Sequence, residues 1–190
     1  MSSALSELEV EDIVSLRDVV VLLQRTEMLM RIAEEIDEYI VELGADGRLV
    51  RLQHEEVLGG IGDERRMVMR DYFNEADDWP LAEAMATLAE LDTEELLDLK
   101  AVAAVLHLPQ GAGDLDLGLQ PRGYRLLSRI PRIPEPIVDH IVDHFGTLSK
   151  IMRATIDDLD DVEGVGDTRA KTIKEGLSKL AESSILDRYS

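Results

Sequence analysis

Apolar residues recur at three- and four-residue steps along residues 5–43 of the chain. This spacing predicts an amphipathic helix, or two joined helices, much longer than an average helix. Ser6 with Glu9 fits a capping box at its start, and Gly44 fits a C-terminal stop. A helix of this length predicts a spine, and its apolar stripe over 16–40 predicts core packing.

Shorter helical patterns follow the long one. Residues 45–53 fit a turn followed by a short helix or a short strand. Asp92 and Glu95 fit a capping box, with Leu91 as its hydrophobic staple, at the start of the last pattern. The helices expected here cover 63–73, 80–91 and 93–108.

The helical period breaks over residues 109–123, which hold four glycines and two prolines. This composition predicts a flexible linker over 109–120. The expected organisation is a helical spine and linker domain over 1–108, then a second helical domain over 121–190. The chain is long enough for two small domains with modest cores.

Charge is distributed unevenly between these two parts. The formal net charge is −20. Residues 1–120 contain 28 acidic and 9 basic residues, a balance of −19, whereas 121–190 contain 12 and 11, a balance of −1. A strongly acidic chain argues against nucleic-acid binding, because that affinity comes from neutralising phosphates. The last seventy residues are locally neutral, which indicates two units with different roles.

Several classes of function find no support in the residues. The chain has no cysteine, so disulfides and thiolate metal sites are excluded. No apolar run approaches the ~20 residues that span a bilayer, and the acidic N-terminus does not fit a signal peptide, so a cytoplasmic protein without membrane contact is expected. No nucleotide-binding, hydrolase or metalloprotease motif occurs. We therefore expect no catalytic residue, no metal ligand and no cofactor.

The last part of the chain contains a repeat at an offset of 32 residues. Residues 127–141 align with 159–173. Two such helix–turn–helix units can bury their apolar sides against each other. A glycine cap at Gly146 and a linking helix over 148–153 are expected between them, followed by a helix that Thr155 and Asp158 begin. The aligned apolar pairs are Leu127 with Leu159, Ile130 with Val162, Ile133 with Val165, Val138 with Ala170, and Ile141 with Ile173.

The second copy fits the helix-hairpin-helix pattern at every position that defines it. The glycines permit unusual backbone angles and close approach, and the helix that follows presents free amides that favour a phosphate. Such contacts ignore base identity. The alternative is a tight turn between helices. The pattern is carried by Leu159, Val162, Gly164, Val165, Gly166, Ala170 and Ile173, and the candidate phosphate-binding residues are Gly164, Val165, Gly166, Asp167, Thr168, Arg169 and Lys171.

The first copy departs from this pattern. Arg132 and Pro134 stand where the glycines of the second copy stand. Pro134 has no amide proton, so this hairpin cannot hold a phosphate in the same way and is expected to be structural. Arg129, Arg132 and Lys174 are candidates for a basic flank beside DNA. The arginines of this region are equally suited to pairing with the acidic first domain.

The tandem arrangement resembles the C-terminal domains of RuvA- and UvrC-type DNA repair proteins. The fuller resemblance, over essentially the whole chain, is to the bacterial DisA family of DNA integrity scanning proteins. Residues 5–53 look like that family's spine helix and its continuation, and 122–146 and 161–186 look like its C-terminal domain. The resemblance implies an all-α fold, with a long spine helix, a small helical domain and a RuvA domain 2-like tandem.

The resemblance also carries implications for function. Members of the family are diadenylate cyclases that make cyclic di-AMP from ATP with Asp-Gly-Ala and Arg-His-Arg motifs, and neither motif is in this sequence. The chain is therefore expected to be no enzyme, but the DNA-sensing part of such a protein, with branched DNA and repair proteins as partners. The family's octamer is assembled largely through the cyclase domains, so the resemblance implies a monomer or weak dimer for this part alone. A different possibility is a protein-interaction and assembly module with no DNA contact.

Overall fold

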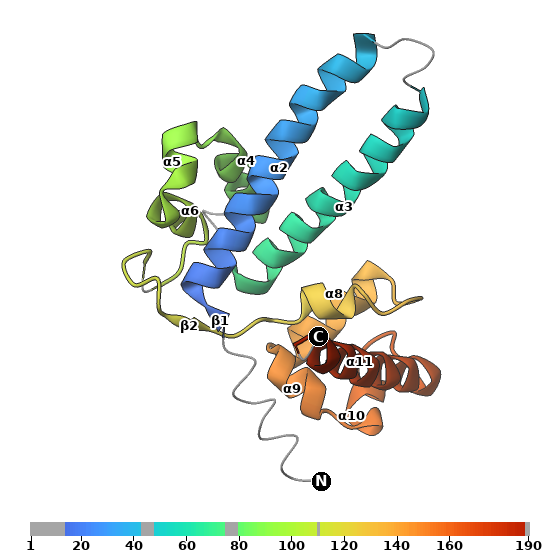
Figure 1. The fold of residues 1–190 in the computed structure, drawn as a ribbon. Coiled ribbons are helices and arrows are strands. Elements are labelled where there is room, and N and C mark those ends of the chain that lie inside the picture. Colours follow the sequence, from blue (N-terminus) through green and yellow to red (C-terminus); the bar gives the residue numbers. More distant parts are fainter. Residues whose placement is uncertain (1–13, 43–47, 75–79, 110, 189–190) are drawn as a thin grey trace. The chain divides into compact units, whose positions relative to one another are not determined.

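The computed structural model describes residues 14–42, 48–74, 80–109 and 111–188. These residues form helices and one short two-stranded ribbon, so the predicted all-α class is confirmed (Figure 1). The predicted caps at Ser6 and Gly44 lie outside the described residues. The chain divides into two compact units, Val14–Leu119 and a second that includes Gln120–Ser190.

The first unit is built on two long helices with smaller helices beside them. The pairing of α2 with α3 forms an antiparallel helical hairpin (Figure 1). Its elements are β1 (Val14–Ser15), α2 (Leu16–Glu42), α3 (Arg48–Tyr72), α4 (Leu81–Glu90), α5 (Thr93–Leu97), α6 (Leu99–Val105) and β2 (Gly118–Leu119).

Helix α3 differs from the sequence-based expectation. It runs unbroken from Arg48 to Tyr72, whereas a turn and a short element were expected over 45–53 and a helix only from 63. Gly59, Gly60 and Gly62 interrupt the apolar pattern but not the helix, and a Cβ at each would meet no atom within 4 Å. Packing along α2 therefore overrides the cost of about 1 kcal/mol that each glycine imposes on a helix.

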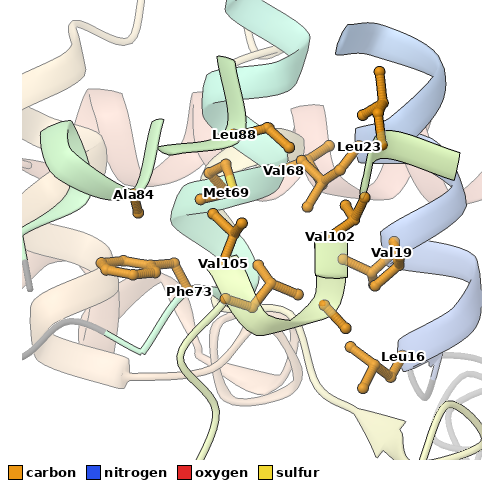
Figure 2. Packing of buried hydrophobic residues seen from close by; sticks show 14 residues of the cluster. Leu16, Val19, Leu23, Val68, Met69, Phe73, Ala84, Leu88, Val102 and Val105 are labelled. Atoms are coloured by element: carbon orange, nitrogen blue, oxygen red, sulfur yellow. The ribbon is translucent and has the colours of Figure 1, made fainter. Parts of the chain in front are cut away.

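The core of the first unit lies where α2 begins and α3 ends. Figure 2 shows Leu16, Val19 and Leu23 of α2 directed toward side chains of α3, α4 and α6. Fully burying one such side chain contributes roughly 1.5–3 kcal/mol. The largest fully buried side chains of this core are Leu16, Leu23, Met69, Phe73, Leu88 and Leu106.

The expected helix over 93–108 is divided by Asp98. The Asp92–Glu95 capping box is confirmed, with Glu95 N 2.8 Å from Asp92 Oδ1 and Asp92 N 3.0 Å from Glu95 Oε2. The chain then leaves helical geometry, and the Asp98 carboxylate accepts from Lys100 N at 2.9 Å to begin α6. A side chain that caps a new helix thus ends the old one.

Residues 114–119 are part of the first unit and do not behave as a linker. Leu16 N donates to Leu117 O at 2.7 Å, and Arg17 N donates to Leu115 O at 2.8 Å. The two-residue strands pair antiparallel through Val14 with Leu119. Because Leu115, Leu117 and Leu119 also pack against the core, this segment closes the unit, and the boundary between the units falls after Leu119.

The apolar stripe of α2 is only partly core. Its first half is buried, but Leu29 is 49% exposed, Ile32 50% and Tyr39 70%. Val50, Leu52 and Val57 of α3 are exposed as well. Ile40 is buried at 3% exposure, so the expectation of core packing is wrong for most, though not all, of the second half of the stripe. The helices α4, α5 and α6 gather at the other end of the hairpin (Figure 1).

The second unit contains five helices within residues 120–188. The cap at Gly146 is confirmed by its φ of 77°, and the box at the start of α10 by Asp158 N 3.1 Å from Thr155 Oγ1. Hydrogen bonds from Thr155 hold the pKa of Asp158 below its usual value. The helices are α7 (Tyr124–Leu127), α8 (Glu135–Phe145), α9 (Leu148–Arg153), α10 (Ile156–Asp160) and α11 (Asp167–Arg188).

Candidate nucleic-acid interface

The 32-residue repeat is present in the backbone. Ile130 N donates to Leu127 O at 3.0 Å in the first copy, and Val162 N donates to Leu159 O at 3.2 Å in the second. The turns also match, since Arg132 has a φ of 69° and Gly164 a φ of 79°. The second unit is thus a tandem of two helix–hairpin–helix units with the same backbone path.

The two glycines of the second hairpin have different roles. Gly164 is required by the fold, because its φ is left-handed and a Cβ there would lie 2.7 Å from Ile137 Cδ1. Gly166 has no positive φ, and a Cβ there would meet nothing within 4 Å. Val165 between them is fully buried and donates its amide to Val162 O at 3.0 Å. Gly166 therefore stands on the open side of an anchored turn.

Gly166 precedes a helix of 22 residues without a side chain to cap it. Ala170 N donates to Gly166 O at 3.0 Å, which makes Gly166 the N-cap of α11. The amides of Asp167, Thr168 and Arg169 lie in the first turn, where an α-helix supplies no backbone acceptor. Together with the helix dipole they favour an anion in front of Gly166.

Basic side chains of α11 lie beside this position and are engaged within the hairpin. Lys171 Nζ lies 2.7 Å from Asp167 Oδ2, and this hydrogen bond raises the pKa of Lys171. Arg169 Nη1 donates to Gly164 O at 2.5 Å. The pair of Lys171 and Asp167 is more than half exposed, and solvent weakens such a pair, so an incoming phosphate can compete for the lysine.

A shallow groove of about 390 Å³ runs beside α11. Three ammonium groups and one carboxylate line it, which gives it a positive balance. Lys171 belongs both to this groove and to the hairpin, so the groove continues the basic surface along the helix. The lining residues are Ile156, Lys171, Lys174, Glu175, Ser178 and Lys179.

Lys174, predicted as part of a DNA flank, has a structural role. Its Nζ donates to Met152 O at 2.7 Å and to Ala154 O at 2.6 Å, so it caps the C-terminal end of α9. Burial lowers the pKa of Lys174, and the nearby Asp158 carboxylate partly opposes this shift. Two of the three donors of this ammonium group are therefore committed to the fold.

We expect Lys174→Met to lower the free energy of unfolding of the second unit by about 1–2 kcal/mol, since two carbonyls lose their donor. Lys179→Met, at an exposed position of the same helix, should change it by less than about 0.5 kcal/mol. Urea unfolding followed by circular dichroism measures both variants. Equal stability of the two variants would show that water replaces the ammonium group at these carbonyls.

Two contacts that hold the hairpins together were not predicted from the sequence. His140 Nδ1 of α8 lies 2.9 Å from Glu163 O in the second hairpin. A Cβ on Gly176 would lie 2.7 Å from Ile130 Cγ2, so α11 passes very close to the first hairpin there. A glycine inside a long helix lowers the stability of the helix, so its presence there indicates a close packing contact. Gly176 is such a glycine, and this contact could have been predicted from it.

Two kinds of feature are absent from the described residues, a cluster of metal-ligating side chains and a membrane-spanning helix. They contain no group of three or more histidine, aspartate or glutamate side chains that could hold a metal ion. Among the same residues, no helix is sufficiently long and apolar to cross a bilayer. His54, which lies in an acidic stretch, has its Nε2 2.6 Å from Ala33 O.

Two family models match the chain. The model of the DisA bacterial checkpoint controller linker region matches residues 1–114, and the model of the SAM-like helix-hairpin-helix tandem matches residues 124–179. The second match covers both hairpins described above.

Curated proteins named DNA integrity scanning protein DisA match the chain along its whole length. Those of Kineococcus radiotolerans, Frankia alni and Streptomyces coelicolor are 50%, 48% and 49% identical to it. The chain covers 53%, 53% and 51% of these proteins, so it spans about half of their length. The chain belongs to the DisA family, with the linker region of that family followed by a helix-hairpin-helix tandem.

Proposed function

We propose that this chain binds the DNA backbone through the second hairpin, without sequence specificity and with a preference for branched DNA. The observation that carries the proposal is the N-terminus of α11. It has an exposed glycine cap and is held in place by the buried Val165. One phosphate accepts hydrogen bonds from the amides after Gly166. Lys171, Thr168 and Arg169 contact its neighbours.

The distribution of charge favours DNA over a small anion. The groove along α11 extends the basic surface beyond one phosphate. The acidic first unit repels a polyanion over a Debye length of about 10 Å at 0.1 M salt, which confines contact to the second unit. Relatives of the chain carry the name DNA integrity scanning protein, which agrees with this assignment.

We place the catalysis of the full-length family outside these residues. The two family models account for 1–114 and 124–179 and describe a linker region and a helix-hairpin-helix tandem. The chain then acts as the DNA-sensing part of a protein that makes cyclic di-AMP and works on the chromosome in the cytoplasm. A single hairpin binds weakly, so several copies in an oligomer, together with repair proteins, provide avidity on a junction.

Gly166→Asp tests the proposal, because aspartate is a favoured N-cap whose carboxylate occupies the amides offered to a phosphate. We expect the variant to be at least as stable as the wild type and to bind DNA about tenfold more weakly or worse. Fluorescence anisotropy with a labelled four-way junction and a duplex of equal composition, over a series of salt concentrations, measures the affinity.

Gly113→Asp is the matched control. It makes the same substitution at an exposed glycine of the first unit, where a Cβ also meets nothing within 4 Å. It should bind DNA as the wild type does. If Gly166→Asp also keeps wild-type affinity, the amides of α11 do not hold the phosphate. If junction and duplex bind equally, the preference for branched DNA is wrong.

The exposed apolar residues of α2 favour a second candidate, an assembly module. Leu29, Ile32 and Tyr39 present apolar surface to solvent on one long helix. Sedimentation velocity distinguishes the two functions. The assembly function would replace the DNA-binding function if two results were found together. The chain would have to associate in a way that Ile32→Glu abolishes, and it would have to fail to bind DNA at low salt.

A further inference from the structure

Arg132, in the turn of the first hairpin, has a backbone conformation that side chains rarely adopt. Its φ of 69° is left-handed, and the equivalent residue of the second hairpin is Gly164, with a φ of 79°. Glycine takes this conformation without steric cost, whereas an arginine is strained by its Cβ. Backbone strain of this kind is found mainly at functional sites, which makes the side chain of Arg132 a candidate for a function.

The side chain of Arg132 is available to a ligand. It is exposed, and within the residues that the structure describes its guanidinium makes no hydrogen bond or ion pair. The basic side chains at the start of α11, by contrast, are engaged within the second hairpin, Arg169 with Gly164 O and Lys171 with Asp167. A guanidinium presents five donors in a plane that suits phosphate oxygens.

The backbone of the first hairpin cannot make the contact that we propose for the second. Pro134 is the N-cap of α8 and Pro136 is its second residue, and neither has an N–H group. Glu135 between them adds a negative charge at the same helix start. A phosphate at this hairpin must therefore be held by a side chain.

The two hairpins lie close to each other in the second unit. Ile137, in the first turn of α8, contacts the Gly164 position, and His140 contacts the carbonyl of Glu163. Arg132 is five residues before Ile137, so their Cα atoms are at most about 19 Å apart. Because Ile137 touches the second hairpin, the two turns lie close enough to contact one DNA molecule, whose two strands border a minor groove about 6 Å wide.

We propose that the first hairpin is a second phosphate site, in which the Arg132 guanidinium replaces the amides that its prolines remove. The inference rests on the proposed function of the second hairpin and extends it. The two hairpins then hold two backbone segments by different chemistry, amides at Gly166 and a side chain at Arg132. Glycine at this position would relieve the backbone strain but lose the contact.

Arg132→Gly and Arg132→Lys test this inference on the whole chain. Arg132→Gly should raise or preserve the urea midpoint of the second unit, yet weaken junction binding about fivefold. The slope of the logarithm of the binding constant against the logarithm of the salt concentration should become shallower by the amount expected for about one phosphate contact. Arg132→Lys keeps both the charge and the strain and should bind within about twofold of the wild type. The probe is the labelled four-way junction.

The outcomes separate this inference from the proposed function. A gain in stability with loss of affinity in Arg132→Gly supports the second site, because a purely structural role would not move the two in opposite directions. If the wild type binds the junction and Arg132→Gly binds it as tightly, the first hairpin is not a phosphate site. The contact proposed for the second hairpin is unaffected by that result. A wild type that does not bind the junction at low salt overturns both.

Discussion

Glu27→Ala is expected to lower the free energy of unfolding of the first unit by about 3–5 kcal/mol. Glu27 is 2% exposed and lies between two arginines of different helices. Its Oε1 accepts from Arg31 Nε at 2.9 Å, and its Oε2 accepts from Arg65 Nη1 of α3. Truncation leaves two guanidinium groups at a buried position without their counter-ion.

The cost should be large because the cluster joins several elements. Arg31 Nη2 also donates to Ala89 O at 3.1 Å and to Leu91 O at 2.7 Å, where α4 ends. Arg65 is nearly buried, and its Nε already lacks a partner among the described residues. Loss of Glu27 therefore removes the charge that holds α2, α3 and the end of α4 in one arrangement.

Urea unfolding followed by circular dichroism measures this loss. Glu34→Ala is the control, because it removes an exposed carboxylate from the same helix and should change stability by less than about 0.5 kcal/mol. If Glu27→Ala were as stable as Glu34→Ala, water would be compensating the arginines and the cluster would contribute nothing.

The second unit was predicted closely because its signals are local. The glycine at 146 and the Thr155–Asp158 pair define helix ends within four residues, and the structure confirms both. The repeat predicted two hairpins, and the backbone turns at Arg132 and Gly164 agree with it. Caps, turns and short apolar periods depend on neighbours in sequence, so they can be read without the fold.

The first unit was predicted less well because tertiary packing decides its elements. Nothing local distinguishes the glycines at 59 and 60, inside α3, from the helix-ending glycine at 146. Likewise 109–120 has the composition of a linker, yet Leu115 and Leu117 are fastened to the start of α2 by hydrogen bonds from residues about 100 positions earlier. Contacts between residues this far apart cannot be recognised in a short stretch of sequence.

The candidate site shows the same division between local and distant information. The hairpin could be located from its pattern, but the role of Lys174 depends on carbonyls at 152 and 154, twenty or more residues away. The different reasons for Gly164 and Gly166 depend on where Ile137 lies. A pattern finds a motif, and only the packed structure separates the residues that build it from those that face a ligand.

Gly164→Val is expected to lower the free energy of unfolding of the second unit by about 2–4 kcal/mol. Most of the loss comes from the φ of 79°, which a β-branched residue tolerates poorly. The rest comes from the new Cβ, which would lie 2.7 Å from Ile137 Cδ1, although that atom ends a flexible side chain and can move. Urea unfolding measured by circular dichroism gives the loss.

Gly166→Val provides the comparison, because it introduces the same side chain two residues later, where a Cβ meets nothing within 4 Å. It should cost no more than about 1 kcal/mol, the difference between a good and a poor N-cap. Gly166→Val should nevertheless weaken DNA binding, since its side chain stands in front of the α11 amides. Equal losses of stability at the two positions would contradict the distinction between them. A replacement of both glycines together could not reveal it, because a loss of binding could then follow from a loss of the fold.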